Sequence, residues 1–415
     1  MSRDKLIELA RTHLHHAVNG TVPLAETVVE IPVQNYFNKD RWKAEMELIF
    51  GRVPLVLGFS SELQKSGDYK AMEVCGVPLI LVRNREGSVG AFVNMCSHRG
   101  AQILDEGKGR ARSFSCPYHA WTYNLAGDLV AILDEQEFGE VDTSCLGLTP
   151  LNVEERVGII WGSITPNTDL HLNEFLAGYD EYLESHDFAN CHLVGQQTIE
   201  GPNWKVAYDG YLDFYHLPIL HKDTFGPEYN NKSIFNNWGP HQRVQAPDHR
   251  LLDLVDIPEE EWSHTKLVSG VWTIFPHISI ASFEAGGHIY MVSQLFPGAD
   301  PDTSVTHQNF LATFEPNSEQ KEEIARTMEF LRYVVAEEDY FTGNRIQKTV
   351  KTGAKSHFYF GRNEEGGQRF HRWTDALLEA QSDEDLFLLY KKGVGLSLDR
   401  CNHHSRCAKI TTIRA

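Results

Sequence analysis

Two short segments of the chain each pair a cysteine with a histidine. The first reads Cys96-Ser97-His98, and the second reads Cys116-Pro117-Tyr118-His119. Soft thiolates and imidazoles in this arrangement are typical metal ligands. Turn-forming residues follow each pair, so two hairpin-like loops could close over one metal centre from both sides. Zinc is an alternative occupant because it also accepts two cysteines and two histidines, although zinc knuckles more often use a Cys-x-x-Cys spacing.

A second candidate metal site lies in the segment NWKVAYDGYLDFYHLPILH, which contains His216 and His221. Two histidines and one carboxylate with open positions suit a non-heme Fe(II) oxygenase, because dioxygen and substrate must both approach the metal. On an ideal helix, residues five apart point about 140° apart. Pro218 lies between the two histidines and should interrupt the helix, which would let His221 turn back toward the same ion.

Both sites resemble those of the Rieske non-heme iron oxygenases, in the terminal (alpha) subunit of aromatic ring-hydroxylating systems. CSHRGAQ and CPYHAWTYN look like the Rieske 2Fe-2S motif, in which two cysteines hold one iron and two histidines hold the other. The resemblance implies four cluster ligands: Cys96, His98, Cys116 and His119. Trp121 would shield the cluster. NWK followed by D-x-x-H-x-x-x-x-H looks like the family's catalytic iron motif, with His216 and His221 as ligands.

The resemblance also implies the third iron ligand. Family members read Glu-Asp, several residues, then Gln, with the aspartate on iron. Here Glu338-Asp339 precedes Gln347 within a long predicted helix. Asp339 is therefore the predicted ligand, and Glu338 is the alternative. Without the family pattern, an acidic run on a helix would be read as solvated surface.

Asp213, three residues before His216, occupies the family's bridging position. The resemblance implies that Asp213 orients His216 and hydrogen-bonds to His119 of the adjacent subunit, which makes it the predicted catalytic carboxylate. Many family members carry Glu-Asn ahead of this aspartate, whereas this chain has Tyr208-Asp209. The role of Asp209 is therefore open.

Hydrophobic periodicity predicts the elements that must position these sites. Helices are predicted over 4–18, 39–50, 170–186, 203–215, 318–350 and 373–389, and strands over 52–166, 270–298 and 306–314. The predicted fold class is α+β in three parts. A helical segment (1–51) packs on the catalytic domain, an all-β Rieske domain follows (52–166), and a catalytic domain (167–415) has an antiparallel sheet covered by helices.

The implied activity is that of a terminal oxygenase component. It would take electrons from a separate reductase or ferredoxin through the Rieske cluster to a mononuclear Fe(II). Oxygen from O2 would then enter an aromatic or similarly hydrophobic substrate by hydroxylation or dihydroxylation. Oxidative O- or N-demethylation is the alternative within the family. No NAD or flavin fingerprint is present, so NAD(P)H would act only through the partner reductase.

Two further expectations follow from the resemblance. Family members are ring-shaped trimers, which implies a homotrimer or an α3β3 assembly. The predicted substrate pocket consists of apolar residues near the iron segment or on the covering sheet, each of which core packing explains equally: Tyr211, Leu212, Phe214, Leu217, Phe275 and Phe296. An alternative from a different functional class is a non-catalytic zinc protein or an electron carrier. Neither function would explain the segment that contains His216 and His221.

The amino-acid composition further limits the kind of protein and the partners that it could bind. The chain has 415 residues, 41% of them hydrophobic, which suffices for a sizeable core. A net charge of -19 argues against nucleic acid and anionic membrane surfaces as partners. No apolar run is long enough to span a membrane. Seven cysteines are too few for a disulfide scaffold and favour a reducing cytoplasm. The stretch from Cys401 to Cys407 is expected to bind no metal, and His13, His15 and His16 are expected at the surface of the first helix.

Overall fold

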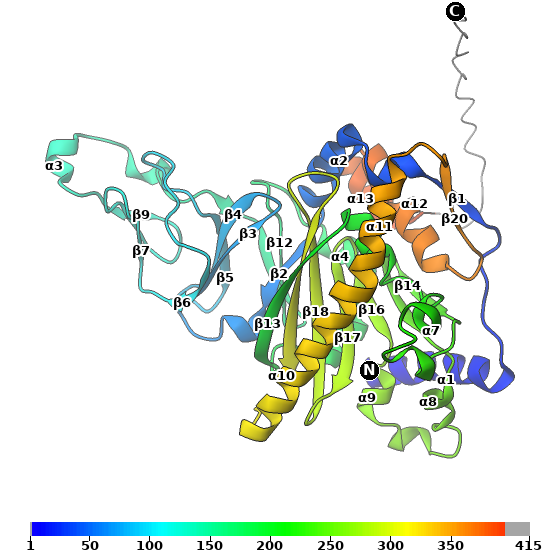
Figure 1. The fold of residues 1–415 in the computed structure, drawn as a ribbon. Helices are drawn as coiled ribbons and strands as arrows, with labels where there is room; N and C mark the ends of the chain where they lie inside the picture. Colours follow the sequence, from blue (N-terminus) through cyan, green and yellow to red (C-terminus); the bar gives the residue numbers. More distant parts are fainter. Residues whose placement is uncertain (1, 395–415) are drawn as a thin grey trace, which may run out of the picture.

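The computed structural model describes residues 2–394 (Figure 1), so the Cys401–Cys407 stretch lies outside the described residues. Its largest sheet is antiparallel, seven-stranded and ordered β13-β19-β18-β17-β16-β15-β14. In that order the strands are His192–Gly201, Ser304–Ala312, His288–Pro297, Ile278–Glu284, Val271–Ile274, His241–Gln245 and Ile234–Trp238. The middle strands, such as β18, are buried along nearly their whole length. Near-continuous apolar runs are what a strand covered on both faces requires.

Three smaller sheets precede the large one in the chain. A five-stranded sheet has the order β10-β5-β4-β3-β6, and its strands are Pro150–Leu151, Val89–Val93, Val77–Arg83, Asp68–Val74 and Gly107–Arg110. A three-stranded sheet contains β11 (Val153–Arg156), β12 (Ile159–Gly162) and β2 (Leu55–Phe59). The third sheet contains β7 (Phe114–Ser115), β8 (Thr122–Tyr123) and β9 (Leu129–Ala131). This mainly β region, which also contains the short helix α3, includes both Cys-His pairs and confirms the α+β prediction.

Helices cover the large sheet and enclose the second candidate site. The longer ones are α1 (Ser2–Asn19), α10 (Ser318–Tyr333), α11 (Phe341–Val350), α12 (Glu365–Glu379) and α13 (Asp383–Lys392). The shorter ones are α2 (Lys39–Glu45), α3 (Glu135–Phe138), α4 (Leu172–Leu176), α5 (Asp180–Leu183), α6 (Trp204–Asp209), α7 (Leu217–Leu220), α8 (His249–Leu252) and α9 (His264–Leu267). In Figure 1, α10 and α11 run as one long rod across the sheet. Among residues 2–394, no helix has both the length and the apolar character needed to cross a membrane.

The N-terminal segment is tied to the catalytic part by buried polar contacts. β1 (Val29–Pro32) pairs with β20 (His357–Phe360) in a two-stranded antiparallel sheet. Glu45 accepts hydrogen bonds from the Lys205 ammonium at 2.5 Å and from the Trp204 indole N–H at 2.9 Å. His13 is fully buried, and its ring nitrogens lie 2.6 Å from Gln245 Oε1 and 2.8 Å from Asn236 Oδ1. The expectation that His13 lies at the surface was therefore wrong, because α1 packs this face onto the edge of the large sheet.

Several predicted helices are shorter or divided. The helix predicted over 203–215 ends at Asp209, because Gly210 follows and the chain turns. The segment 170–186 contains two short helices and a 3-10 turn, with residues of positive φ at His171 and Ala177 interrupting a continuous helix. The long helix over 318–350 is confirmed, but a π-helical segment, Val334–Tyr340, separates α10 from α11. Such segments are frequent at functional sites.

Candidate active site

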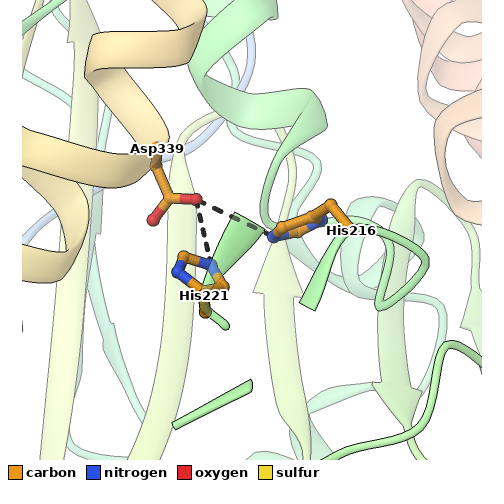
Figure 2. A group of neighbouring side chains, drawn as sticks. All are labelled: His216, His221 and Asp339. Atoms are coloured by element: carbon orange, nitrogen blue, oxygen red, sulfur yellow. Dashed lines mark ion pairs between the residues drawn. The ribbon is translucent and has the colours of Figure 1, made fainter. Parts of the chain in front are cut away.

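Three side chains from two elements, the ends of α7 and the π-helical segment Val334–Tyr340, meet beside the large sheet. One Oδ1 atom of Asp339 lies 3.8 Å from His216 Nε2 and 3.3 Å from His221 Nε2, as Figure 2 shows. These are the only three His, Cys, Asp or Glu residues between 2 and 394 whose ligand atoms all lie within 4.8 Å of one another. Ligand atoms about 2.1 Å from a metal and at right angles lie about 3 Å apart. The three donor atoms could therefore bind a single ion from one side and leave the opposite side of that ion open to other ligands.

The local fold explains how residues five apart can face one ion. His216 is the N-cap of α7 and His221 is its C-cap, so the two imidazoles bracket a single helical turn. Pro218 lies in the first turn of α7, where a missing N–H has no cost, and does not interrupt a helix between the histidines as predicted. His221 leaves the helical conformation, with φ -94° and ψ 23°. This change of direction turns its side chain back toward Asp339.

Each histidine has a carboxylate partner that fixes its ring. Asp213 Oδ1 lies 3.0 Å from His216 Nδ1, and Glu338 Oε2 lies 2.7 Å from His221 Nδ1. Glu338 also accepts a hydrogen bond of 2.9 Å from the Thr224 hydroxyl. With Nδ1 donating to a carboxylate, Nε2 of each ring carries its lone pair toward the ion. Glu338, named from the sequence only as an alternative ligand, therefore orients the ring of His221, one of the candidate ligands.

The environment also affects protonation of the two rings. Burial lowers the pKa of His216, but its hydrogen bond to Asp213 and the nearby carboxylates outweigh burial and raise it above its usual value. The pKa of His221 is likewise raised by Asp339 and Glu338 against the effect of burial. Three carboxylates around two imidazoles therefore make a site of excess negative charge, which is what a divalent cation requires.

Asp209 does not join this group. Its carboxylate accepts a 2.9 Å hydrogen bond from the Tyr36 hydroxyl and lies 3.1 Å from His371 Nε2. Tyr36 is buried, and burial followed by the charge of Asp209 raises its pKa well above the ordinary value. Asp209 thus links the N-terminal segment and α12 behind the site. No spacing in the sequence connects these three residues, so this network was missed.

A cavity of about 550 Å³ opens beside the three converging side chains. That volume is typical of a site for a small organic molecule. Its walls are mainly apolar, and those residues include Tyr211, Phe214, Leu217, Phe225, Tyr229, Phe283, Met291, Phe330, Leu331 and Val335. His216, His221 and Asp339 form part of the wall. A molecule bound in the cavity would therefore contact any ion that these three residues hold.

Half of the predicted pocket residues line this cavity. Tyr211, Phe214 and Leu217 do so. Leu212, Phe275 and Phe296 lie elsewhere in the buried core. Phe275 packs on Phe370, and Phe296 packs on His277, each within 6 Å between ring centres. Phe296 lies on β18, whereas Leu212 and Phe275 lie in the turns after α6 and β16, and none of the three lines the cavity.

The two Cys-His pairs form the other candidate metal site. Cys96 and Cys116 are buried and free of disulfides. The His98 and His119 rings lie 4.7 Å apart between centres, and the Nδ1 atom of each is buried without a hydrogen-bond partner. A buried ring nitrogen with no partner is costly unless a ligand satisfies it. The donor set, with both Nδ1 atoms unpaired, therefore fits a Rieske 2Fe-2S cluster.

Neighbouring side chains support the loops that carry these four donors. Trp121 stacks on His98 at 4.8 Å and 12°, in agreement with the shielding role that the resemblance implied. The Tyr123 hydroxyl lies 3.2 Å from Cys96 Sγ and accepts a hydrogen bond from the Ser97 N–H. Within residues 2–394, the four donors do not form a group compact enough for one ion. This is evidence against a single zinc ion held by all four donors.

Comparisons with known proteins match the two regions of the chain that contain these sites. Residues 53–143 match the Rieske [2Fe-2S] domain family, and residues 188–380 match the family described as ring hydroxylating alpha subunit (catalytic domain). The carnitine monooxygenase oxygenase subunit of Escherichia coli (strain K12) is 28% identical, over 80% of this chain and 86% of its own length. The glycine betaine monooxygenase oxygenase subunit of Pseudomonas aeruginosa (strain UCBPP-PA14) is 32% identical over 46% of this chain and 45% of its own.

The fold is similar to that of solved structures as well. A naphthalene 1,2-dioxygenase with indole bound in its active site aligns with a TM-score of 0.71, covering 89% of this chain and 96% of that one. The identity in this alignment is 18%, so the likeness concerns the arrangement of the two parts and not the substrate.

Proposed function

Because the chain belongs to the Rieske non-heme iron oxygenases as a terminal oxygenase (alpha) subunit, we propose that it hydroxylates or dihydroxylates an aromatic or similarly hydrophobic molecule. The observation that carries this choice is the largely apolar cavity of about 550 Å³ beside the His216, His221 and Asp339 side chains. Burial of apolar substrate surface would supply the binding energy. Polar side chains in the wall, such as Gln245, Ser279 and His288, would set the orientation of the substrate.

The proposed roles of the residues follow from their contacts. His216, His221 and Asp339 hold the iron, and Asp213 and Glu338 fix the two imidazole rings. Iron at this site would supply the redox chemistry that activates dioxygen, with electrons from a cluster held by Cys96, His98, Cys116 and His119. The apolar walls exclude water from the bound substrate and hold its reacting carbon near the iron.

The assembly is proposed to be a homotrimer, or an α3β3 complex if a second subunit is present. Figure 1 shows α3 and β7, beside the cluster ligands, at one end of the molecule, whereas α7 lies toward the other end. Asp213 is near the surface beside α7, and its neighbours Tyr215 and Ile219 are 52% and 75% exposed. An electron would therefore pass from the cluster of one subunit through His119 to Asp213 of the next. The electron donor is a separate reductase, either directly or through a ferredoxin.

A second candidate is oxidative demethylation of a quaternary ammonium compound. Two of the similar proteins are named for carnitine and glycine betaine. The cavity wall of this chain places the carboxylates of Glu228 and Asp248 among the rings of Phe225 and Tyr229. Aromatic faces beside carboxylates suit an organic cation. Arg250 already stacks on Tyr229 at 4.1 Å and pairs with Asp248, which reduces the charge available to such a substrate.

The choice between these reactions is tested with the reduced holoenzyme, its reductase and labelled dioxygen. Oxygen uptake is screened with aromatic hydrocarbons, aromatic acids and quaternary amines. Label in a hydroxylated ring product supports the proposal. Release of formaldehyde with turnover of quaternary amines, and no turnover of aromatic compounds, would establish demethylation in its place.

Transfer between subunits is tested by mixing two inactive variants. Cys96→Ser removes the cluster, and His216→Ala removes iron binding. Mixed assemblies contain subunits whose intact cluster faces the intact iron site of a neighbour. Recovery of part of the turnover supports transfer between chains, whereas no recovery in verified mixed assemblies contradicts it.

A further inference from the structure

A row of polar side chains, the polar row, crosses the face of the large sheet that lines the cavity. Each of the seven strands contributes one residue, which is directly opposed to the next in the strand register. Directly opposed residues of antiparallel strands point to the same face of a sheet. In strand order from β13 to β14, the polar row consists of Gln197, Gln308, Ser293, Ser279, Thr273, Gln242 and Asn237.

The polar row lies in an otherwise apolar and buried part of the sheet. Its five inner residues are at most 4% exposed, whereas the residue at each end is partly exposed at an edge of the sheet. The next row on the same face is apolar and contains Phe310, Met291 and Ala281. Ser279, at the centre of the polar row, belongs to the cavity wall together with Met291 and Ala281. The polar row therefore joins the cavity to both edges of the sheet.

The half of the polar row from Ser279 to Gln197 has polar atoms that are free to bind water. Gln197 Nε2 donates a hydrogen bond of 2.6 Å to Gln308 Oε1, which fixes the orientation of the Gln308 amide. Gln308 and Ser293 are directly opposed on β19 and β18, yet Gln308 Nε2 and Ser293 Oγ are buried without a hydrogen-bond partner among residues 2–394. Such atoms are costly unless they are bonded, and buried water commonly provides the bond.

The other half of the polar row is occupied by direct bonds. The Thr273 hydroxyl donates to the Gln242 carbonyl at 3.2 Å, and Gln242 Nε2 donates to the Gly366 carbonyl at 3.0 Å. Asn237 Nδ2 lies 3.3 Å from Glu365 Oε1. The amide oxygens of Gln242 and Asn237 have no partner in the described part of the chain, but both can only accept hydrogen bonds. This half therefore contacts α12 and lacks a free hydroxyl that could pass a proton toward the cavity.

Tyr211 lies where the first half of the polar row approaches the candidate iron site. Its ring lines the cavity, and its hydroxyl is buried with no hydrogen-bond partner among residues 2–394. Burial raises the pKa of Tyr211 to about 12, and the Ser293 hydroxyl and the Asp339 carboxylate are close enough to affect it as well. The Tyr211 hydroxyl is therefore near both the polar row and one of the three converging side chains.

We infer that water bound along the half of the polar row from Gln197 to Ser293 carries protons from the edge of the sheet to the cavity. The inference rests on the proposed function, because the reaction consumes protons. Monohydroxylation converts R–H, dioxygen, two electrons and two protons to R–OH and water. Dihydroxylation takes up the same electrons and protons and places both oxygen atoms in the product. The reductase supplies the electrons, but the mainly apolar cavity wall keeps bulk water away, so the protons need a separate route.

The path uses hydroxyl groups and water in turn. Water between Gln308 Nε2 and Ser293 Oγ accepts a hydrogen bond from the amide and donates one to the hydroxyl. Ser293 then donates to Ser279, in the cavity wall, or to the Tyr211 hydroxyl. Each group gives up one proton as it receives another, so none of these residues changes its charge. Every proton that enters the cavity is replaced by one from solvent at the edge of the sheet.

The first test locates the water by neutron diffraction from crystals of the holoenzyme soaked in D2O. One ordered water is expected within hydrogen-bonding distance of both Gln308 Nε2 and Ser293 Oγ, and it should be absent in Gln308→Leu. This measurement does not depend on turnover. A dry row, in which both atoms bond to other protein atoms, would overturn the inference.

The second test interrupts the path with two variants outside the cavity wall, Ser293→Ala and Gln308→Leu. Gln242→Leu is the control for Gln308→Leu, because it removes a buried glutamine from the opposite half of the polar row, also one strand from an edge. Ser163→Ala is the control for Ser293→Ala, because Ser163 is equally buried and its hydroxyl donates to the Thr165 carbonyl. Cluster absorbance and bound iron verify that each protein is intact.

Turnover of the most active compound from the oxygen-uptake screen is measured in H2O and in D2O. Ser293→Ala and Gln308→Leu should lower kcat at least about tenfold, with KM unchanged, and should raise the ratio of the rates in H2O and D2O. Both controls should match the parent. An unchanged kcat and isotope ratio in Ser293→Ala would contradict the path, and an equal loss in Gln242→Leu would do so by showing a general disturbance of the sheet. A parent that holds iron and cluster but oxidises no compound counts against the proposed function, whereas a dry row counts against the path.

Discussion

Removal of the Glu338 carboxylate should weaken iron binding without removing an iron ligand. Its Oε2 atom lies 2.7 Å from His221 Nδ1 and 2.9 Å from the Thr224 hydroxyl. The side chains of His221 and Glu338 are only 2% and 11% exposed, so water cannot replace the contact. A hydrogen bond to a charged group contributes about 1.5–3 kcal/mol, which corresponds to roughly 10- to 150-fold in an equilibrium constant. Glu338→Ala should therefore lower iron affinity by up to about 100-fold.

Glu338→Gln removes the negative charge of the carboxylate and keeps a hydrogen-bond acceptor at the same position. Its amide oxygen can still accept from His221 Nδ1–H, so the loss should be smaller, about tenfold. The measurement is competition for Fe(II) between the apoprotein and a chelator, with cluster absorbance as the folding control. Thr224→Val is the matched variant, since it removes only the second contact and should change affinity little. Unchanged iron affinity in Glu338→Ala would refute the orienting role. If Asp339→Ala kept iron and Glu338→Ala lost it, the ligand assignment itself would be wrong.

Three further outcomes are expected. Asp213→Ala should keep the cluster spectrum and lose turnover by about 100-fold or more, and unimpaired steady-state turnover would contradict its bridging role. Lys205→Met leaves the buried Glu45 carboxylate without its ammonium partner, so unfolding in urea should show a loss of about 3 kcal/mol in stability. Arg41 Nε also lies 2.9 Å from Glu45 Oε1, and an unchanged urea midpoint would show that Arg41 alone suffices. Burial lowers the pKa of four histidines to about 3: His13, His186, His241 and His277. Below about pH 6.5 the unfolded chain protonates these rings, whereas the folded chain keeps them neutral. The free energy of unfolding should therefore be highest above pH 6.5 and should decrease toward pH 3, by up to ~1.4 kcal/mol per pH unit for each ring. Equal denaturation midpoints at pH 7.5 and 5.5 would contradict this account.

The parts of the site that the sequence predicted are those set by local spacing. The Cys-x-His and Cys-x-x-His pairs each lie in one short loop, so their donors are close in any fold that forms the loops. His216 and His221 likewise bracket a single turn. Asp339 came from a distant helix and was assigned only through the family pattern, yet the structure places it against both histidines.

The parts that could not be predicted depend on strand register and on helix phase. Whether Phe296 faces the cavity depends on which face of the sheet its side chain takes, and a shift of one residue reverses the answer. Phe275 lies in the turn after β16, where the alternation of a strand does not set the direction of its side chain. The contact of Asp209 with Tyr36 and His371 joins segments far apart in the sequence, with no shared motif. The burial of His13 depends on how α1 docks, since its neighbours His15 and His16 stay at least partly exposed.

The π-helical segment Val334–Tyr340 accommodates about one extra residue in the turn that carries Asp339, within an otherwise continuous helix. Upstream, α10 turns Ile324 and Leu331 into the core, and downstream α11 buries Gly343, Gln347 and Val350. Gly343 fits closely there, because a Cβ atom would lie 2.8 Å from Pro202 Cγ. A deletion of one residue within the segment would restore an ordinary α-helix and keep α11 close to its present rotational setting, but it would remove the widened turn from which Asp339 reaches the two histidines. Length variation among homologous chains should therefore be excluded from these seven positions, while loops at the ends of the same helix remain free to vary.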